Sequence, residues 1–153
     1  MSLYLFLSYS LARRKITSMK IEHFALNVPD PVRMAPWYAE HFGWQIRRSK
    51  DAPPFARFIA DSTGNVMLEI YHNPAAYIPD YFSMNPLTLH LALECGPDLD
   101  ATRQRLLDAG ATDAGGLLIT PAGDRLAMLR DPWGVPIQLC HRKKPLYNSV
   151  LRI

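Results

Sequence analysis

Cysteine is scarce in this chain, which has two thiols, Cys95 and Cys140, among 153 residues. Two cysteines set in apolar runs are ordinarily packed core residues, and nothing in their number or spacing resembles a disulfide framework. The chain also has no apolar run long enough to cross a bilayer. We therefore expect a cytoplasmic protein with no membrane partner.

Acidic residues are missing from both ends of the chain. Residues 1–20 and 142–153 each hold four basic residues and no acid, whereas residues 21–141 hold nine basic and fourteen acidic residues. The sequence pI near 9.0 is therefore set by the ends, and the middle of the chain is acidic. An acidic folded part lacks the basic face that nucleic-acid phosphates require, so we expect no nucleic-acid partner.

A secretory signal is missing as well. The apolar run at residues 3–7 precedes the positive charges at residues 13–15, whereas a secretory signal carries its charge first. Met19 stands directly before the first predicted strand. We interpret residues 1–19 as an N-terminal appendage that can pair with a neighbouring chain, and residues 143–153 as a basic C-terminal tail.

The sequence does contain one pattern twice. With 48% hydrophobic residues, the chain is large enough for a single domain with a substantial core. Residues 21–28 and 87–94 both alternate as half-buried strands do, with apolar residues on one face and a histidine, His23 or His90, on the other. One strand histidine is ordinarily structural or exposed, but a repeated one needs an explanation.

The elements predicted after these two strands also match. In the first half we predict a helix between Asp30 and Gly43, followed by strands at residues 44–48, 55–60 and 66–71. In the second half we predict a helix between Asp98 and Gly110, followed by strands at residues 112–119, 125–130 and 136–141. Residues 74–86 are rich in proline and aromatic residues, and form a linker that either covers the core or makes one wall of a pocket.

Each half also places a polar residue on its last strand, Glu69 in the first half and Gln138 in the second. Glu69 follows His23 by 46 residues, and Gln138 follows His90 by 48 residues. If the two sheets face each other, the four side chains converge, and they are acceptable ligands for a divalent Zn, Ni, Fe or Mn ion. Alternatively, the histidines donate to nearby backbone and Glu69 lies at an exposed sheet edge.

Residues 20–142 resemble the vicinal oxygen chelate superfamily, which includes glyoxalase I, the bleomycin resistance proteins and the extradiol dioxygenases. The likeness is carried by IEHFALNVPD at 21–30, VMLEIYHN at 66–73, LHLALE at 89–94 and DPWGVPIQL at 131–139. It implies an α+β fold in which two βαβββ modules, residues 20–73 and 87–142, pair into an open, curved mixed-sheet cup. It also implies a homodimer, and a metal ion held by His23, Glu69, His90 and Gln138.

Gln138 is a departure from the glyoxalase I pattern, to which the chain is otherwise most similar. The matching position there is a glutamate that binds the metal and moves the substrate proton, and glutamine cannot act as a base. The same change weakens an extradiol dioxygenase assignment. Glu69 is then the expected catalytic base. Tyr71 and Asn27 share its face by strand alternation, and we expect them to contact the substrate or line the cup.

Three functions therefore stay open, all with a small-molecule substrate or ligand. The intact His23, Glu69 and His90 favour a metal-dependent isomerase or lyase of the glyoxalase kind, which is the function we expect. Gln138 favours a metal-free binding protein of the resistance type, and an oxygen-dependent dioxygenase is a third possibility. Arg57 and Arg125 are candidates to meet an acidic substrate.

Overall fold

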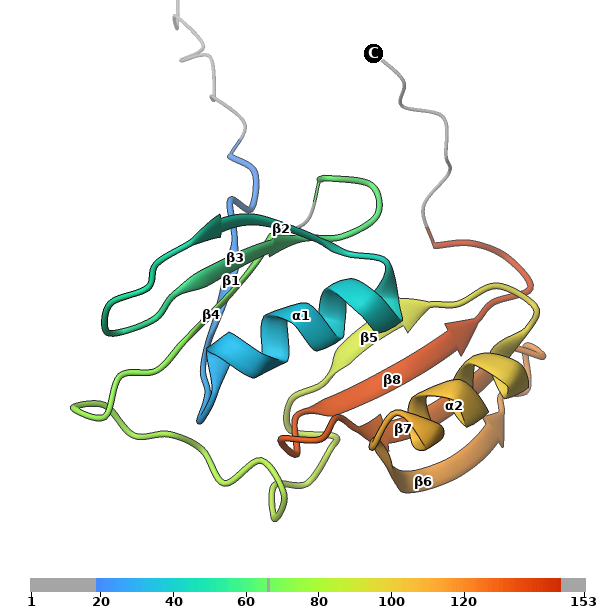
Figure 1. Ribbon diagram of the computed structural model, residues 1–153. Coiled ribbons are helices and arrows are strands. Elements are labelled where there is room, and N and C mark those ends of the chain that lie inside the picture. The colour runs from blue at the N-terminus through green and yellow to red at the C-terminus, as the bar shows by residue number, and fades with distance from the viewer. Residues whose placement is uncertain (1–18, 66, 147–153) are drawn as a thin grey trace, which may run out of the picture.

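The structure is a computed structural model that describes residues 19–65 and 67–146. Its first module contains one helix and a four-stranded sheet in the order β1-β4-β3-β2 (Figure 1). Its elements are β1 (Phe24–Asn27), α1 (Pro31–Phe42), β2 (Gln45–Ser49), β3 (Arg57–Ala60) and β4 (Met67–Tyr71). In the sheet, β1 runs parallel to β4, and the other neighbouring strands are antiparallel.

The second module repeats this arrangement, with its sheet in the order β5-β8-β7-β6. Its elements are β5 (Leu91–Glu94), α2 (Leu99–Asp108), β6 (Thr112–Ile119), β7 (Arg125–Arg130) and β8 (Pro136–His141). Again the first and last strands, β5 and β8, are parallel and the remaining pairs are antiparallel. The fold is thus α+β, with two βαβββ modules and sheets that do not close, which confirms the predicted class.

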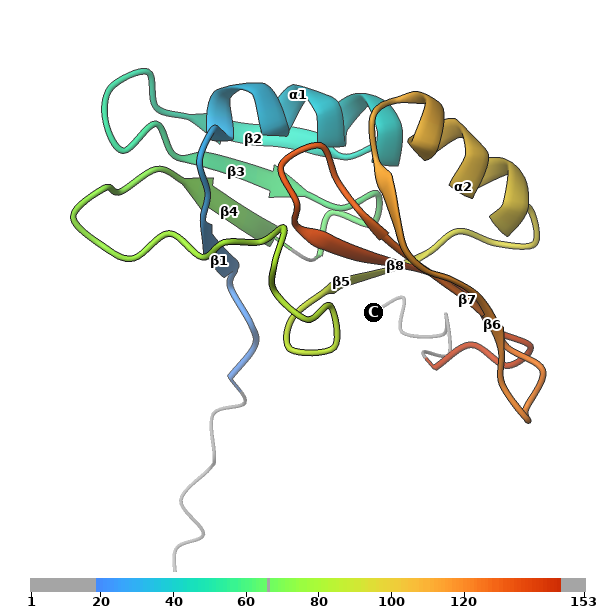
Figure 2. The same cartoon turned by 90° about the horizontal axis from the view of Figure 1, so that it is seen from below.

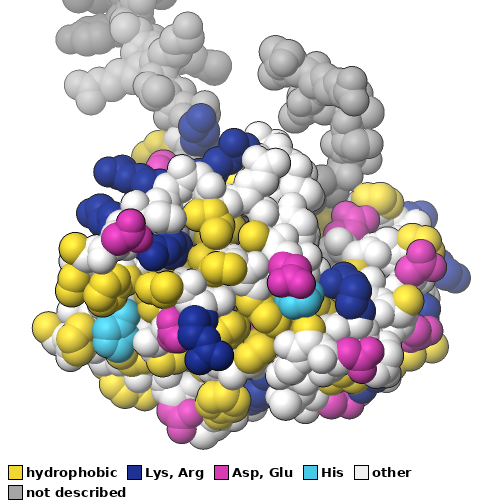
Figure 3. All heavy atoms as spheres, viewed as in Figure 1, with side chains coloured by type: hydrophobic (Ala, Val, Ile, Leu, Met, Phe, Trp, Pro, Cys, Tyr) yellow, Lys and Arg dark blue, Asp and Glu magenta, His cyan; other side chains and the backbone are white. Residues whose placement is uncertain are grey.

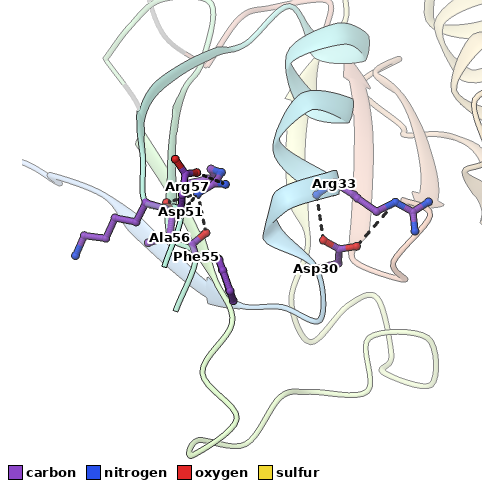
Figure 4. Close-up of polar contacts among 7 residues, drawn as sticks. Asp30, Arg33, Asp51, Phe55, Ala56 and Arg57 are labelled. Carbon is purple, nitrogen blue, oxygen red and sulfur yellow. Dashed lines mark hydrogen bonds and ion pairs between the residues drawn. The ribbon is translucent and has the colours of Figure 1, made fainter. Parts of the chain in front are cut away.

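The ends of α1 follow from local sequence. The carboxylate of Asp30 accepts a hydrogen bond from the Arg33 backbone N–H at 3.1 Å, and Pro31 begins the helix where an N–H is not needed (Figure 4). Gly43 ends it in the left-handed conformation, with φ 70°. In α2, Asp98 makes no such side-chain bond. Both helices nevertheless lie between the residues that the sequence marks as their limits.

The first strand of each module is shorter than predicted. Both strands begin one residue after their histidine, so His23 precedes β1 and His90 precedes β5. In the second module the reason is a turn, because the backbone N–H groups of Leu87 and Thr88 bond to the side chain and backbone oxygens of Asn85. The two histidines keep equivalent places despite this shortening.

Both helices lie on the same side of the two sheets (Figure 2). Core side chains such as Ile59 and Ile70 in the first module, and Leu129 and Ile137 in the second, are fully buried. Residues on alternate positions of the same strands, such as Phe58, Glu69 and Gln138, occupy the opposite face. We call this face of each sheet, which no helix covers, its open face.

Helix α1 joins the modules, because its residues pack against both cores. Trp37 contacts both apolar clusters, and its indole N–H donates to the carbonyl of Ala109 at the end of α2, at 3.0 Å. The Tyr38 hydroxyl donates to the carboxylate of Asp131, in the turn before β8, at 2.7 Å. These contacts tie the helix of the first module to two places in the second.

The linker lies against both modules through a few side chains. Tyr81 is buried, and its hydroxyl donates to the Asn27 carbonyl at 2.9 Å, as expected of an aromatic that covers the core. Tyr77 and Phe82, by contrast, are exposed. From β7, the guanidinium of Arg130 donates to the Tyr81 carbonyl.

Within the described residues, no helix is long and apolar enough to span a membrane.

Candidate functional site

The first module brings His23 to Glu69 on its open face. Glu69 on β4 is in register with Ala25 on β1, and His23 lies two residues before Ala25, on the same face. The imidazole Nε2 and the Glu69 Oε2 are 3.3 Å apart. The ring also stands edge-on to Phe58, with centroids 5.9 Å apart. About a fifth of the Glu69 side chain is exposed, so a ligand can reach the carboxylate.

The other ring nitrogen of His23 is held by Glu22. Nδ1 bonds to the Glu22 carboxylate, and this bond is the main reason that the pKa of His23 is raised. The smaller desolvation effect lowers the pKa, and the charges of Glu22 and Glu69 raise it further. Sequence reasoning missed Glu22, because neighbouring residues of a strand point to opposite faces. Glu22 and His23 precede β1, so strand alternation does not apply to them and their side chains can meet.

The second module repeats the register. Gln138 on β8 is paired with Ala92 on β5, and His90 lies two residues before Ala92. The Nδ1 of His90 is 3.0 Å from the carbonyl of Pro86. A carbonyl can only accept, so Nδ1 is the donor in this contact. The amide oxygen of Gln138 accepts from the thiol of Cys140 at 3.4 Å.

The His23–Glu69 pair has the spacing of two ligands on one metal ion, but no third such ligand joins it within the described residues. Ligand atoms bound tetrahedrally at about 2.1 Å stand about 3.4 Å apart, close to the 3.3 Å between His23 Nε2 and Glu69 Oε2. Among residues 19–65 and 67–146, however, no three His, Cys, Asp or Glu side chains come together as a group that could hold an ion. That all four residues bind one ion stays a prediction.

Gln138 lines a hollow on the open face of the second sheet. The hollow has a volume of about 300 Å³, and apolar side chains of β6, β7 and the segment before β5 line most of it. They include Leu87, Leu118, Leu126 and Met128. Besides backbone, the polar side chains that line it are the amides of Asn85 and Gln138. The lining of this hollow therefore offers shape and neutral hydrogen bonding, and no charged side chain.

A sequence model of the Glyoxalase/Bleomycin resistance protein/Dioxygenase superfamily matches residues 20–139. The chain belongs to this superfamily. No curated protein matches it significantly in sequence.

Several solved structures have a similar fold. An antibiotic-binding protein from Streptomyces sp. CB03234, TnmS3, is 23% identical, with a TM-score of 0.58 over 82% of this chain and 100% of its own. A glyoxalase family protein from Bacillus cereus is 15% identical, with a TM-score of 0.68 over 85% of this chain and 98% of its own. A glyoxalase-related enzyme from Fulvimarina pelagi is 16% identical, with a TM-score of 0.63 over 82% of this chain and 89% of its own. At these identities the likeness concerns the fold.

In this superfamily member, Asn27 holds the linker. Its amide N–H₂ donates to the carbonyls of Asn73, Ala76 and Tyr77, at 3.0, 3.4 and 3.3 Å, and its oxygen accepts from the Asn73 backbone N–H at 2.8 Å. Tyr71 is in register with Asn27 and half-buried. Contact of either side chain with a substrate stays a prediction. The structural role of Asn27 had no signal in the sequence, because its partner lies 46 residues away.

The two arginines proposed to meet an acidic substrate are engaged within the protein. Arg57 is buried, and its guanidinium bonds to backbone carbonyls of the loop between β2 and β3 and to Asp51 (Figure 4). One guanidinium nitrogen of Arg125 contacts both carboxylate oxygens of Asp100, at 2.8 and 2.7 Å. Both are therefore structural groups in this chain.

Proposed function

We propose that this protein is a metal-dependent isomerase or lyase of the glyoxalase kind, with a small-molecule substrate that carries two adjacent oxygens. The observation that supports it best is the matched state of the two histidines. Each has Nδ1 engaged, by Glu22 in one module and by the Pro86 carbonyl in the other. An anchored Nδ1 is the usual arrangement of a histidine that binds metal through Nε2.

His23, Glu69, His90 and Gln138 are the residues that would hold the ion, a divalent Zn, Ni, Fe or Mn. When bound, such an ion stabilises negative charge that develops on the substrate oxygens. Gln138 contributes a neutral oxygen and cannot take a proton. Glu69 is then the carboxylate of the set, and in this proposal it removes a proton from the carbon beside the oxygens and returns it to the next one.

The proposal includes a homodimer, because the half-sites, His23 with Glu69 and His90 with Gln138, are not joined within the part of one chain that the structure describes. β1 and β5 each have a hydrogen-bonded neighbour on one side only, so one edge of each strand is open within the described residues. Both open faces lie on the side away from the helices (Figure 2). A second copy can therefore bring its second module to the first module of this chain, so that the cup is completed across the pair.

The second candidate is a metal-free binding protein. It is supported by the apolar hollow beside Gln138, which would hold an uncharged part of a ligand by shape. The similar TnmS3 is described as an antibiotic-binding protein. In this alternative the His23–Glu69 pair is a polar contact to the ligand, and Glu69 moves no proton.

Metal retention separates the two candidates. Purified full-length protein is incubated with Ni²⁺, Zn²⁺, Mn²⁺ or anaerobic Fe²⁺, desalted, and analysed for metal per chain. The first candidate predicts about one ion retained per site for at least one metal, and its loss in Glu69→Ala and in His90→Ala alike. Glu40→Ala, at an exposed position of α1, is the matched control and should retain metal. If no metal is retained, the binding candidate remains.

A further inference from the structure

Arg48 on β2 is a charged group on the open face of the first sheet, and no described carboxylate forms an ion pair with it. β2 is the edge strand, and Arg48 is in register with Phe58 on β3. The guanidinium carbon lies 6.0 Å from the centre of the Phe58 ring, within the range of a cation–π contact. Among the described residues, the ion pairs between arginine and a carboxylate are made by other arginines, namely Arg33, Arg57, Arg103, Arg125 and Arg142.

A row of side chains connects Arg48 to the candidate site. Phe58 is in register with Glu69 on β4, which is in register with Ala25 on β1 beside His23. The Phe58 ring has the Arg48 guanidinium above it and the edge of His23 beside it. The Phe58 ring therefore lies between the Arg48 guanidinium, at the sheet edge, and the His23–Glu69 pair.

Basic residues on an edge strand also have a simpler role, because they prevent strands of other molecules from pairing there. Arg47, Arg48 and Lys50 are all exposed, and Lys and Arg side chains gather at this end of the molecule (Figure 3). Arg47 reaches the turn at Gly64 instead of the open face. Arg48 differs from its neighbours because an aromatic ring fixes its charge over the face that carries Glu69.

We propose that Arg48 binds the anionic group of the ligand, and that the ligand is a small organic anion whose planar or apolar body lies on Phe58. The inference rests on the proposed site for the position of the ligand's other end, beside His23 and Glu69. β2 and β4 are two strands apart, about 10 Å between backbones, so a ligand of roughly one ring spans the two ends once the long arginine side chain is included. A guanidinium binds carboxylate and phosphate alike through paired N–H donors.

Two probes that differ in charge but not in shape test this assignment. Benzoate and benzamide are titrated into the metal-stripped full chain at low salt, and binding is followed by ligand-observed NMR. Benzoate should bind at least ten times more tightly than benzamide. Arg48→Gln should lower the affinity for benzoate at least tenfold. Arg47→Gln, which removes the same charge from the next residue, should change it less than twofold. Phenyl phosphate, as a third probe, distinguishes a phosphate ligand from a carboxylate ligand by its higher affinity.

Several outcomes would overturn the assignment. The first is no binding of benzoate, and the second is equal affinity for benzoate and benzamide. The third is an equal loss of benzoate affinity in Arg47→Gln and Arg48→Gln, because that result would indicate general attraction to a basic edge. Phe58→Leu should weaken all aromatic probes, because it removes the ring on which they lie. Since no metal is present in these titrations, a failure of metal retention and a failure of anion binding are distinguishable.

Discussion

The two modules share one backbone plan but present different chemistry on their open faces. In both, a histidine precedes the first strand and lies two residues before the partner of a polar residue on the last strand. The first module adds charge, with Glu69 beside His23 and Arg48 over Phe58. The second adds the neutral Gln138 and an apolar hollow. In the function proposed above, the repeated fold supplies paired positions, and the two halves have diverged into a reactive half and a shape-matching half.

The turn before the last strand shows the same contrast, and it gives the largest predicted effect. Asp131 accepts from the backbone N–H groups of Trp133 and Val135 and from Tyr38, and is fully buried. Asp61, before β4, accepts from the backbone and hydroxyl of Thr63 at a solvent-accessible turn. Asp131→Ala should lower the free energy of unfolding by about 3–4 kcal/mol, because three donors lose their acceptor. For Asp61→Ala, urea denaturation should show a loss in the free energy of unfolding of less than about 1 kcal/mol. Similar losses in both variants would contradict this comparison.

The buried turn should also make stability depend on pH. Burial raises the pKa of Asp131 to about 6, against bonds from Tyr38 and the backbone that lower it. The folded state thus holds this proton more tightly than the unfolded state, whose pKa is 3.8. The resulting stabilisation is full below pH 3.8 and is lost as the pH rises through 6, by up to about 3 kcal/mol. Relative to the wild type, Asp131→Asn should become steadily more stable from pH 4 to pH 7. A constant difference across this range would contradict the shift.

Removing one bond between the modules should have a smaller effect. Tyr38→Phe keeps the packing of α1 and deletes the hydrogen bond to Asp131. We expect a loss of about 1–2 kcal/mol in the free energy of unfolding, measured by urea denaturation. In Asp131→Ala, where the partner is already gone, the same substitution should cost almost nothing. Full additivity of the two changes would show that the bond does not couple the modules.

The two histidine anchors differ in that one is a side chain and the other is backbone. Glu22→Gln should lower the pKa of His23, because the carboxylate that raises it is removed. The Nδ1 of His90 is held instead by the backbone carbonyl of Pro86, which this variant leaves in place. NMR titration of the His23 imidazole protons measures the change in pKa. An unchanged pKa of His23 would show that Glu22 does not hold this ring.

Much of the fold was predictable from sequence because turn residues mark its boundaries. β6, β7 and β8 have the predicted limits, since Gly110 and the turn from Asp131 to Gly134 leave little choice of register. The first strands were predicted too long, because alternation of apolar residues continues past their true starts. The alternation of apolar residues cannot reveal that the backbone N–H groups of Leu87 and Thr88 bond to Asn85 and form a turn.

The candidate site was predictable only as far as strand pairing determines it. The approach of His23 to Glu69 follows from the pairing of first and last strands. The engagement of Arg57 with a loop, and of Asn27 with the linker, depends on where irregular backbone passes, and no pattern records that. Likewise, the sequence could not indicate that three of the predicted ligands fail to meet within the described part of one chain.

The central claim is that the half-sites of two chains hold one ion, and mixing two defective variants tests it most directly. His23→Ala damages the first module and His90→Ala the second, so each variant alone should retain no metal. Refolded as an equal mixture, mixed dimers contain one intact site, and metal retention should return to about one quarter of the wild-type value. No recovery in the mixture, with metal retained by the wild type, would contradict a site shared between chains.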